Sequence, residues 1–484
     1  MSGSIRIEKL GKPGVFAFAE SFEHDAEAAS KDYGMPTLRR VAVPGYKWLR
    51  ETREAKKSHA EQSIDDLIRA LTSPLTLEEA KPKPLVREPF PPIKITAATY
   101  EFTVEEFNQL FLENRWGDGL YLVPPTPERV KWMLTGTSRS PQEVIGTVLP
   151  KKGICTIEKI AINAVMAGAK PEYLPVIIAA MEGLTDKDFD LLHVMASMGN
   201  FTLAIIVSGP IGKEINMNSD YAFLGYGWRA NATIGRAVRL CLLNMGHLWP
   251  GVNDMATLGR QHPYTFYAFA ENEELNPWKP YHVGEGYKPE DNCVTVSTIG
   301  SYGGWAITDF RAPTIKAGLE NIIKSISEAR KGVFGLFKRG FANPSAHPLK
   351  HLILLDPETA KGLQAIGFTT QESLRNYIYE HTSVPYEDLR PEEINNIKDR
   401  IAGSKAGDMI FSDIIPPDRI PVFEEALKPG GKVPILITPK DIHVIVAGGK
   451  PGSPIGMSYI RAPYKWTSHQ TKLIRGATLT KAGR

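Results

Sequence analysis

The chain has 484 residues, more than one ordinary domain holds, so we expect two or three domains. Apolar residues make up 42% and charged residues 23% of the sequence, which is typical of a soluble globular protein with a large buried core. The formal net charge is only +3, and no apolar stretch is long enough to cross a bilayer. The sequence therefore predicts neither a nucleic-acid partner nor a membrane partner.

Cysteine usage and the N-terminus favour a reduced cellular compartment. Cys155, Cys241 and Cys293 lie far apart, and none belongs to a Cys-x-x-Cys pair. The N-terminus lacks the apolar core of a signal peptide. We therefore expect a cytoplasmic protein without a disulfide framework. No HExxH motif and no cysteine–histidine cluster is present, so the sequence predicts no metal site and leaves any cofactor unknown.

Residues 1–76 have the pattern of a small α/β unit. Short apolar runs predict strands at 15–19 and 40–44, and helical patterns follow at 21–33 and 60–71. Two strands and two helices are too few for a doubly wound sheet, so we expect this unit to be incomplete. The apolar residues at helical spacing in its second helix are Ile64, Leu67, Ile68 and Leu71.

The rest of the chain alternates strands and helices. Residues 77–100 are rich in proline and lysine, which is typical of an extended linker, and a main body at 101–312 and a further region at 313–484 follow. Strands are expected at 121–123, 202–207, 294–296, 351–355, 433–437 and 442–446, and helices at 157–167, 173–181, 234–245, 314–329 and 370–379. The predicted fold class is α/β with α+β elements, multidomain, with a truncated N-terminal α/β unit and a larger mixed α/β body.

Candidate ligand-binding residues are densest at 208–236, where a buried strand runs into a glycine-rich turn and then a helix. Such loops and helix N-termini bind polar or anionic ligands in α/β proteins. The candidates are Asn216, Asn218, Arg229, Asn231 and Arg236. The two arginines and Asn231 could surround a carboxylate or phosphate. A turn followed by ordinary helix capping explains the same pattern equally well.

Acidic residues crowd a second segment, 251–286. Glu271, Glu273 and Glu274 are close neighbours in the chain, and His282 follows after an aromatic stretch. A carboxylate held near a like charge can have a raised pKa and act as an acid or base, so Glu271, Glu273 and His282 are candidate catalytic residues. A solvated turn and a structural histidine are the alternative interpretation.

Two further pairs complete the candidates. Glu158 and Lys159 stand at the start of an apolar helix, where they are either catalytic or a surface ion pair. Gly448 and Gly449 follow a strand, and their backbone amides could cradle an anion, although a tight turn is as good an explanation.

Several of these stretches resemble a bacterial protein family. Residues 11–75, including Val41-Ala-Val-Pro44, resemble the C-terminal half of the UGSC family, small α/β (seleno)proteins named for a Cys- or Sec-Gly-Ser-Cys motif. The larger part of the chain is similar to UGSC-like proteins. Its matching stretches are 118–130, 158–168, Asn231-Ala-Thr-Ile-Gly-Arg-Ala, Ala270-Glu-Asn-Glu-Glu, Pro277-Trp-Lys-Pro-Tyr-His-Val and 446–449.

The resemblance implies a missing half. The chain contains no Cys-Gly-Ser-Cys motif, so the family's reactive residue has no counterpart here. A second polypeptide carrying the Cys/Sec-Gly-Ser-Cys half-domain would complete the unit and cover its open edge. The expectation is a subunit of a bacterial enzyme complex, a hetero-oligomer that acts on a small polar or anionic molecule with a thiolate or selenolate from its partner. A self-sufficient acid–base hydrolase or lyase and a non-catalytic binding or scaffold subunit are the alternatives; the proline-rich linker and the basic segment 331–339 suit partner contact.

Overall fold

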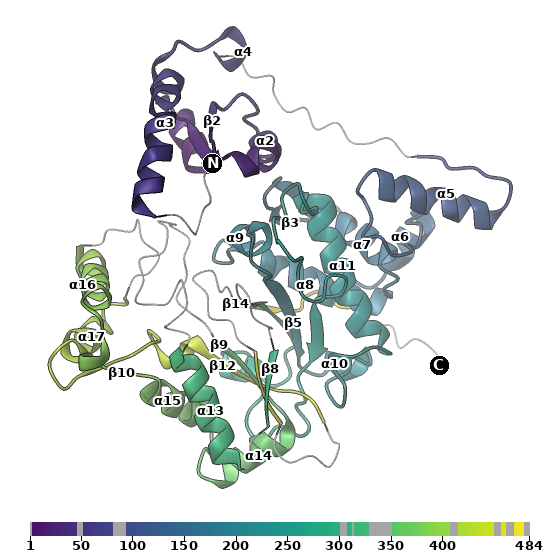
Figure 1. Cartoon of the computed structure of the whole chain (residues 1–484). Coiled ribbons are helices and arrows are strands. Elements are labelled where there is room, and N and C mark those ends of the chain that lie inside the picture. The colour runs from purple at the N-terminus through teal and green to yellow at the C-terminus, as the bar shows by residue number, and fades with distance from the viewer. Residues whose placement is uncertain are drawn as a thin grey trace. The chain divides into compact units, whose positions relative to one another are not determined.

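The chain folds into two compact units of mixed helix and strand, which confirms the multidomain α/β class (Figure 1). The computed structural model describes residues 2–45, 52–80, 93–300, 307–311, 314–328, 351–406, 415–449, 456–460 and 469–478. The first unit comprises residues 1–120 with 147–154 and 242–255, and the second comprises 121–146, 155–241 and 256–484. The division predicted at 76, 100 and 312 stays a prediction. Half of the expected linker, 81–92, and the basic segment 331–339 lie outside the described residues.

The first unit contains a two-stranded parallel sheet. Strand β1 pairs with β2, with Phe16 opposite Arg40 and Ala19 opposite Val43. The Arg39 guanidinium donates to the carbonyls of Ala70 and Ser73 and so ties the end of helix α3 to the sheet. The elements of this unit are α1 (Ser2–Lys9), β1 (Phe16–Ala19), α2 (Glu23–Asp32), β2 (Arg40–Val43), α3 (Arg53–Thr72), α4 (Leu77–Ala80) and α5 (Tyr100–Glu113).

Helix α3 leaves an apolar stripe exposed. Its inner face buries Ser63, whereas Ile64, Ile68 and Leu71 are 49%, 52% and 39% exposed. These three positions recur at helical spacing, so they form one continuous surface on the side away from the two-stranded sheet. A sheet of two strands offers a helix too little surface to bury two faces. The expectation that this unit is incomplete stays a prediction.

Two four-stranded sheets form the centre of the second unit. One has the strand order β14-β7-β5-β6 and the other β12-β9-β13-β8. Strand β5 runs parallel to β6 and antiparallel to β7. The strands are β5 (Thr202–Ser208), β6 (Tyr267–Ala270), β7 (Cys293–Ile299), β8 (Ile307–Arg311), β9 (His351–Leu355), β12 (Ile442–Val446), β13 (Gly456–Ile460) and β14 (His469–Leu473).

The two sheets pack face to face. Ala204 and Ile206 on β5 and Phe269 on β6 share a buried cluster with Leu352 and Leu354 on β9. Because successive side chains of a strand point to opposite faces, the alternate residues of β9 must be covered from the other side. Every residue of β5, β7, β9 and β12 is accordingly buried, which explains why these segments read as continuous apolar runs.

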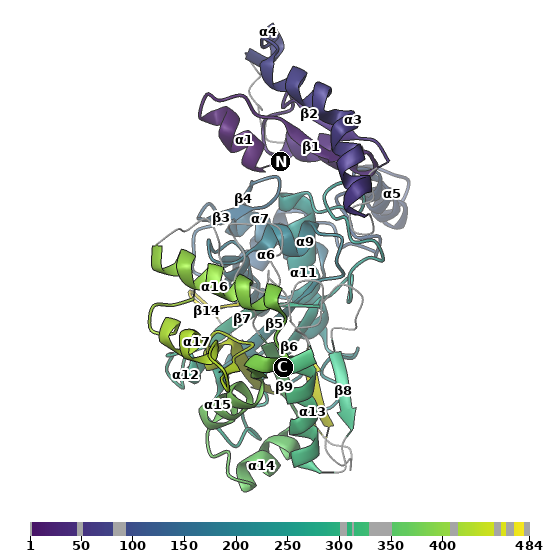
Figure 2. The same cartoon turned by 60° about the vertical axis from the view of Figure 1, so that its left-hand side comes forward.

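Helices cover the outer faces of both sheets. Helix α8 (Leu174–Leu184) packs on β7 and β14. On the other sheet, Ile353 and Val444 pack with Ile322 of α13 (Ile315–Glu328) and Leu374 of α15 (Gln371–His381). Figure 2 shows α13 and α15 beside β9 on that side. The second unit therefore has four layers: helices, sheet, sheet, helices.

Further helices and short strands complete the described chain. They are α6 (Pro127–Leu134), β3 (Val144–Val148), β4 (Gly153–Thr156), α7 (Ile157–Met166), α9 (Leu191–Ala196), α10 (Ile211–Glu214), α11 (Arg229–Gly246), α12 (Tyr281–Gly284), α14 (Pro357–Ala365), β10 (Val384–Pro385), α16 (Pro391–Ala406), α17 (Ile420–Ala426) and β11 (Lys432–Val433). No helix among the described residues is both long and apolar enough to cross a membrane.

Some expected elements differ from the structure. The strand expected at 433–437 shrinks to β11, because Pro434 has no N–H to donate to a ladder. The segment 121–123, also expected as a strand, is irregular. Strand β6 lies in a stretch without a predicted element; only four residues long, it is too short to be recognised by periodicity.

Arg260 is buried and ends helix α9. Its guanidinium donates to five backbone carbonyls, those of Val194, Met195, Ser197, Gly199 and Phe201. The last carbonyls of a helix have no partner within the helix, so a cation that binds them closes the helix end. Arg260 thereby fixes the loop that leads into β5.

We predict that Arg260→Met lowers the free energy of unfolding by about 3 kcal/mol, because it leaves buried carbonyls without donors. Urea denaturation followed by circular dichroism measures the change. The matched control is Arg69→Met, since the Arg69 side chain is 72% exposed and its ion pair with Asp66 contributes less than about 1 kcal/mol. Equal stability of the two variants would contradict the role given to Arg260.

Candidate functional site

The candidate site lies where the parallel strands β5 and β6 end. Val207 lies opposite Ala270, so Ser208 and Glu271, the next residues of the two chain segments, lie side by side. The Glu271 amide donates to the Val207 carbonyl at 2.9 Å and prolongs the pairing by one residue. Gly209 turns with a φ of +98°, and a Cβ there would lie 2.3 Å from the Asp291 carbonyl oxygen. Ligand sites of open α/β sheets occur at such carboxyl ends.

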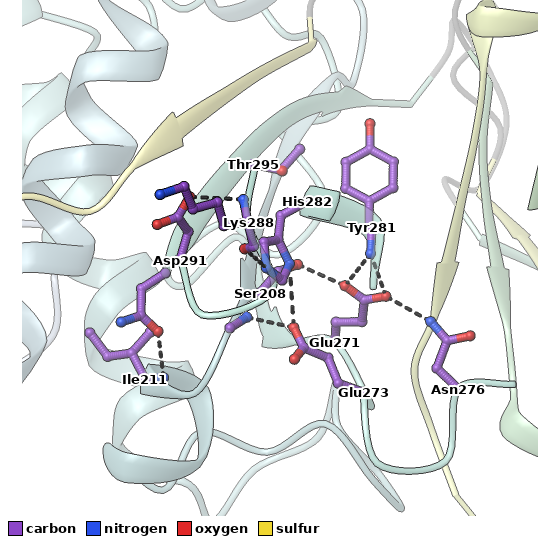
Figure 3. Close-up of polar contacts among 12 residues, drawn as sticks. Ser208, Ile211, Glu271, Glu273, Asn276, Tyr281, His282, Lys288, Asp291 and Thr295 are labelled. Carbon is purple, nitrogen blue, oxygen red and sulfur yellow. Dashed lines mark hydrogen bonds and ion pairs between the residues drawn. The ribbon is translucent and has the colours of Figure 1, made fainter. Parts of the chain in front are cut away.

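Glu271 is buried and surrounded by hydrogen-bond donors (Figure 3). Ser208 Oγ donates to Oε2 at 2.8 Å, and Asn276 Nδ2 donates to Oε1 at 3.0 Å. The Tyr281 amide reaches both oxygens at 3.0 Å. Three separate segments, the end of β5, the loop after β6 and the start of α12, therefore converge on one carboxyl group.

Burial and a neighbouring charge raise the pKa of the Glu271 carboxyl, whereas its hydrogen bonds lower it. The pKa of the Glu271 carboxyl is raised to about 8 as the net result: desolvation raises it most, the bond from Ser208 lowers it in part, and the nearby charge of Glu273 raises it. A buried carboxyl with a neighbouring carboxylate is the environment in which enzymes hold an acid or base. The sequence-based expectation for the acidic segment is consistent with this environment.

Glu273 and His282 stand next to Glu271. The Gly209 amide donates to Glu273 Oε1. His282 is fully buried; its Nε2 lies 3.1 Å from the Lys288 carbonyl oxygen, and its Nδ1 lies 3.6 Å from Glu273 Oε1. Figure 3 shows the imidazole and both carboxyl groups pointing toward one another. The structure thus brings together the three residues that the sequence analysis named as catalytic candidates in this segment.

A pocket of about 300 Å³ opens beside this cluster. Its lining includes Gly209, Lys213, Asn216, Ser219 and the segment 270–274. The Lys213 ammonium pairs with the exposed carboxylate of Glu274 at the rim. The volume suits a small molecule, and the lining is polar and carries more carboxylates than cations.

Of the predicted ligand-binding residues, Asn216 lines the pocket. Asn218 lies between two lining residues and is hydrogen-bonded to Asn231. Asn231 Oδ1 accepts from the Asn218 amide at 2.8 Å, and Asn231 Nδ2 donates to the Asn218 carbonyl at 3.1 Å. That carbonyl also accepts from the Ala270 amide at 3.2 Å. The two asparagines therefore link helix α11 to the end of β6 and act as supports.

The two arginines donate to backbone groups. Arg229 contacts the Gly168 carbonyl through Nε at 2.9 Å and Nη2 at 2.8 Å, and Arg236 Nη2 donates to the Tyr121 carbonyl at 3.1 Å. Through these bonds the two arginines hold Gly168 and Tyr121 against helix α11. The geometry gives no support to the expectation that they surround an anionic ligand.

The glycine pair at 448–449 packs against the lining of the pocket. The Gly448 amide donates to the Ser219 carbonyl at 2.8 Å, and its carbonyl accepts from Asn272 Nδ2 at 3.2 Å. A Cβ on Gly449 would lie 1.5 Å from Asp220 Oδ1. Close packing, with the Gly448 amide already bonded, explains both glycines without an anion.

Glu158 and Lys159 lie in the first turn of α7. The Lys159 side chain is exposed, and its amide bonds to the capping hydroxyl of Thr156 at 3.3 Å. These residues lie at the capped start of α7, which directly follows strand β4. The structure does not gather them with the Glu271 cluster.

The three cysteines are buried thiols. Burial raises the pKa of Cys155 and of Cys293 to about 12, and that of Cys241 well above its ordinary value. A thiol of this kind is neutral near pH 7 and is a weak nucleophile.

The sequence analysis missed a buried cluster beside the site. Tyr281 Oη lies 2.7 Å from His443 Nδ1 and 2.6 Å from His469 Nε2, and the two imidazoles stack with ring centres 3.6 Å apart. The phenol has one proton, so it donates to one imidazole and accepts from the other. This contact joins α12 to strands β12 and β14 of the two sheets. Only the three-dimensional pairing of distant strands reveals it.

No protein-family model, curated protein or solved structure matches this chain. The resemblance to UGSC-like proteins therefore stays a prediction, and the interpretation of the site rests on its geometry.

We predict that Tyr281→Phe lowers the free energy of unfolding by about 1–3 kcal/mol, because the hydroxyl that bonds both His443 and His469 is buried. Thermal and urea unfolding measure the loss. Tyr226→Phe is the matched control, since Tyr226 is 96% exposed and its substitution should change little. A Tyr281→Phe variant as stable as the control would show that the bridge does not hold the layers together.

Proposed function

We propose that the chain is an enzyme, or the substrate-binding subunit of one, that acts on a small polar molecule in the pocket beside Glu271 and Glu273. The observation that carries the proposal is the convergence of two carboxyl groups and one imidazole at the edge of a 300 Å³ pocket. Buried polar groups of this kind are costly to maintain, and their concentration at a strand end is typical of an active site.

The charge of the pocket narrows the substrate class. Three carboxyl groups, those of Glu271, Glu273 and Glu274, line it together with one lysine, and that lysine pairs with Glu274. An anionic substrate would meet like charge there. We therefore favour a neutral or cationic polar molecule over an anionic one, and acid–base or hydrolytic chemistry over reactions that need a thiolate of this chain.

We predict that Glu271→Gln lowers turnover by at least about 100-fold, because loss of a positioned proton-carrying or charge-stabilising group has effects of this size. Product formation is measured by mass spectrometry on a panel of small amides, esters, amino alcohols and hydroxy acids. Glu358→Gln is the matched control, because the Glu358 side chain is 59% exposed and does not belong to the lining of this pocket. Its turnover should stay within about twofold of the wild type.

Treatment with iodoacetamide, which alkylates thiols, distinguishes acid–base chemistry from thiol-dependent chemistry. Acid–base chemistry at Glu271 uses no thiol and should survive alkylation, whereas chemistry that uses the thiolate of a partner chain should be lost. Glu271→Gln turning over the panel as fast as the wild type would remove the proposed active site.

A second candidate function follows from the exposed stripe on α3. We propose that Ile64, Ile68 and Leu71 bind a second polypeptide, whose chemistry the family resemblance gives as a Cys- or Sec-Gly-Ser-Cys half-domain. An exposed apolar stripe next to a two-stranded sheet is a surface that a complementary α/β half would bury.

We predict that Ile68→Glu weakens binding of a recombinant Cys-Gly-Ser-Cys half-domain at least about tenfold, because it places a charge in an apolar interface. Isothermal titration calorimetry on the full chain measures the affinity. The control is Gln62→Glu, which adds the same charge at an exposed position of the same helix. Equal affinities of the two variants, or no binding to the wild type, would remove this candidate function.

A further inference from the structure

His282 presents an unused ring nitrogen to the two carboxyl groups. Its side chain is 0% exposed, and Nε2 bonds to the Lys288 carbonyl, which can only accept, so that Nε2 carries the proton of the neutral ring. The lone pair then lies on Nδ1, which has no hydrogen-bond partner. Glu273 Oε1 is 3.6 Å from Nδ1, which is too long for a hydrogen bond. A buried lone pair aimed at two carboxyl groups needs an electron-pair acceptor.

The three side chains are spaced as the ligands of one ion. One atom each from Glu271, Glu273 and His282 lie within 4.8 Å of one another. We propose that these three residues bind one divalent cation of the first transition row, such as Zn²⁺ or Mn²⁺. Two carboxylates balance its charge, and the imidazole selects it over Mg²⁺ and Ca²⁺, which prefer oxygen ligands alone.

The groups around the ligands are those of a built metal site. The bond from His282 Nε2 to a backbone carbonyl fixes the ring and its tautomer, as it does for most metal-bound histidines. Ser208 and Asn276 orient Glu271, and the Gly209 amide orients Glu273. With the Tyr281 amide, which both oxygens of Glu271 share, three donors contact that carboxylate and one contacts Glu273. A carboxylate offers about four acceptor sites, so each keeps at least one lone pair for a cation.

The position of the cluster also suits a catalytic ion. Three protein ligands leave coordination positions open, and both glutamates line the pocket. A cation there would polarise a carbonyl or activate a water on a bound substrate. This catalytic consequence rests on the proposed function, whereas the binding itself does not.

Metal binding to the full-length chain is the test. After dialysis against EDTA and removal of the chelator, titration calorimetry with ZnCl₂ and MnCl₂ should show one ion per chain, and MgCl₂ and CaCl₂ should bind at least about tenfold more weakly. Co²⁺ should give a visible absorption band in the wild type, a readout that needs no variant.

Variants assign the ligands. His282→Gln and Glu273→Gln should each weaken Zn²⁺ binding at least about tenfold and abolish the Co²⁺ band, whereas Glu274→Gln should bind as the wild type does. Because Glu273 is 24% exposed, its variant folds even if His282→Gln does not. Wild-type protein that binds no ion, or Glu273→Gln that binds like the wild type, overturns the site.

The two proposals fail in different ways. Stoichiometric binding without turnover on the substrate panel removes the proposed function and leaves the metal site intact. Wild-type protein that binds none of the added ions and still turns over the panel removes the metal site and leaves the proposed function intact.

Discussion

The burial of the Glu271 carboxyl is the constraint on which the candidate site depends. A carboxylate without solvent is stable only where donors or positive charge replace water. Ser208, Asn276 and the Tyr281 amide supply the donors, and each comes from a different segment. The carboxyl group at the centre of the candidate site therefore also fixes the end of β5, the loop after β6 and the start of α12 relative to one another. Glu273 adds a second carboxyl group, and its charge is one of the causes that raise the pKa of Glu271.

The four-layer arrangement confines polar chemistry to the strand ends. Both faces of β5 and β9 are covered, so their side chains have no access to solvent. The Asn272 amide donates to the Val446 carbonyl at 2.8 Å, which ties the acidic segment to β12 of the second sheet as well as to β5. The polar segment 271–282 consequently lies where the two sheets meet, with the buried contacts of Tyr281 on one side and the pocket on the other. Rigid elements on several sides hold the three converging groups in place.

The sequence predicted local features well and long-range ones poorly. The strands at 202–207, 351–355 and 442–446 were recognisable because covered strands are continuous apolar runs. Their assembly into two facing sheets was not, since pairing between β5 and β7 or β9 and β13 joins segments far apart in the chain. Strand β14, with the polar sequence His-Gln-Thr-Lys-Leu, carries no apolar signal at all. The mixed α/β class thus follows from the apolar patterns of the sequence, whereas the order in which the strands pair does not.

The same distinction explains which candidate residues the structure gathers. Glu271, Glu273 and His282 were named because carboxyl groups and a histidine follow one another closely, and a short segment curling at a strand end brings them together. Arg229 and Arg236 were named because polar residues at a helix N-terminus suit an anion. A guanidinium, however, bonds as readily to a carbonyl as to a ligand, and spacing cannot tell the two apart. The burial that turns Glu271 into a perturbed acid is a property of the packed layers, and it leaves no mark in the order of the residues. Such a site is recognised only from the structure, which places a ring nitrogen of His282 and one oxygen of each carboxyl group within 4.8 Å of one another.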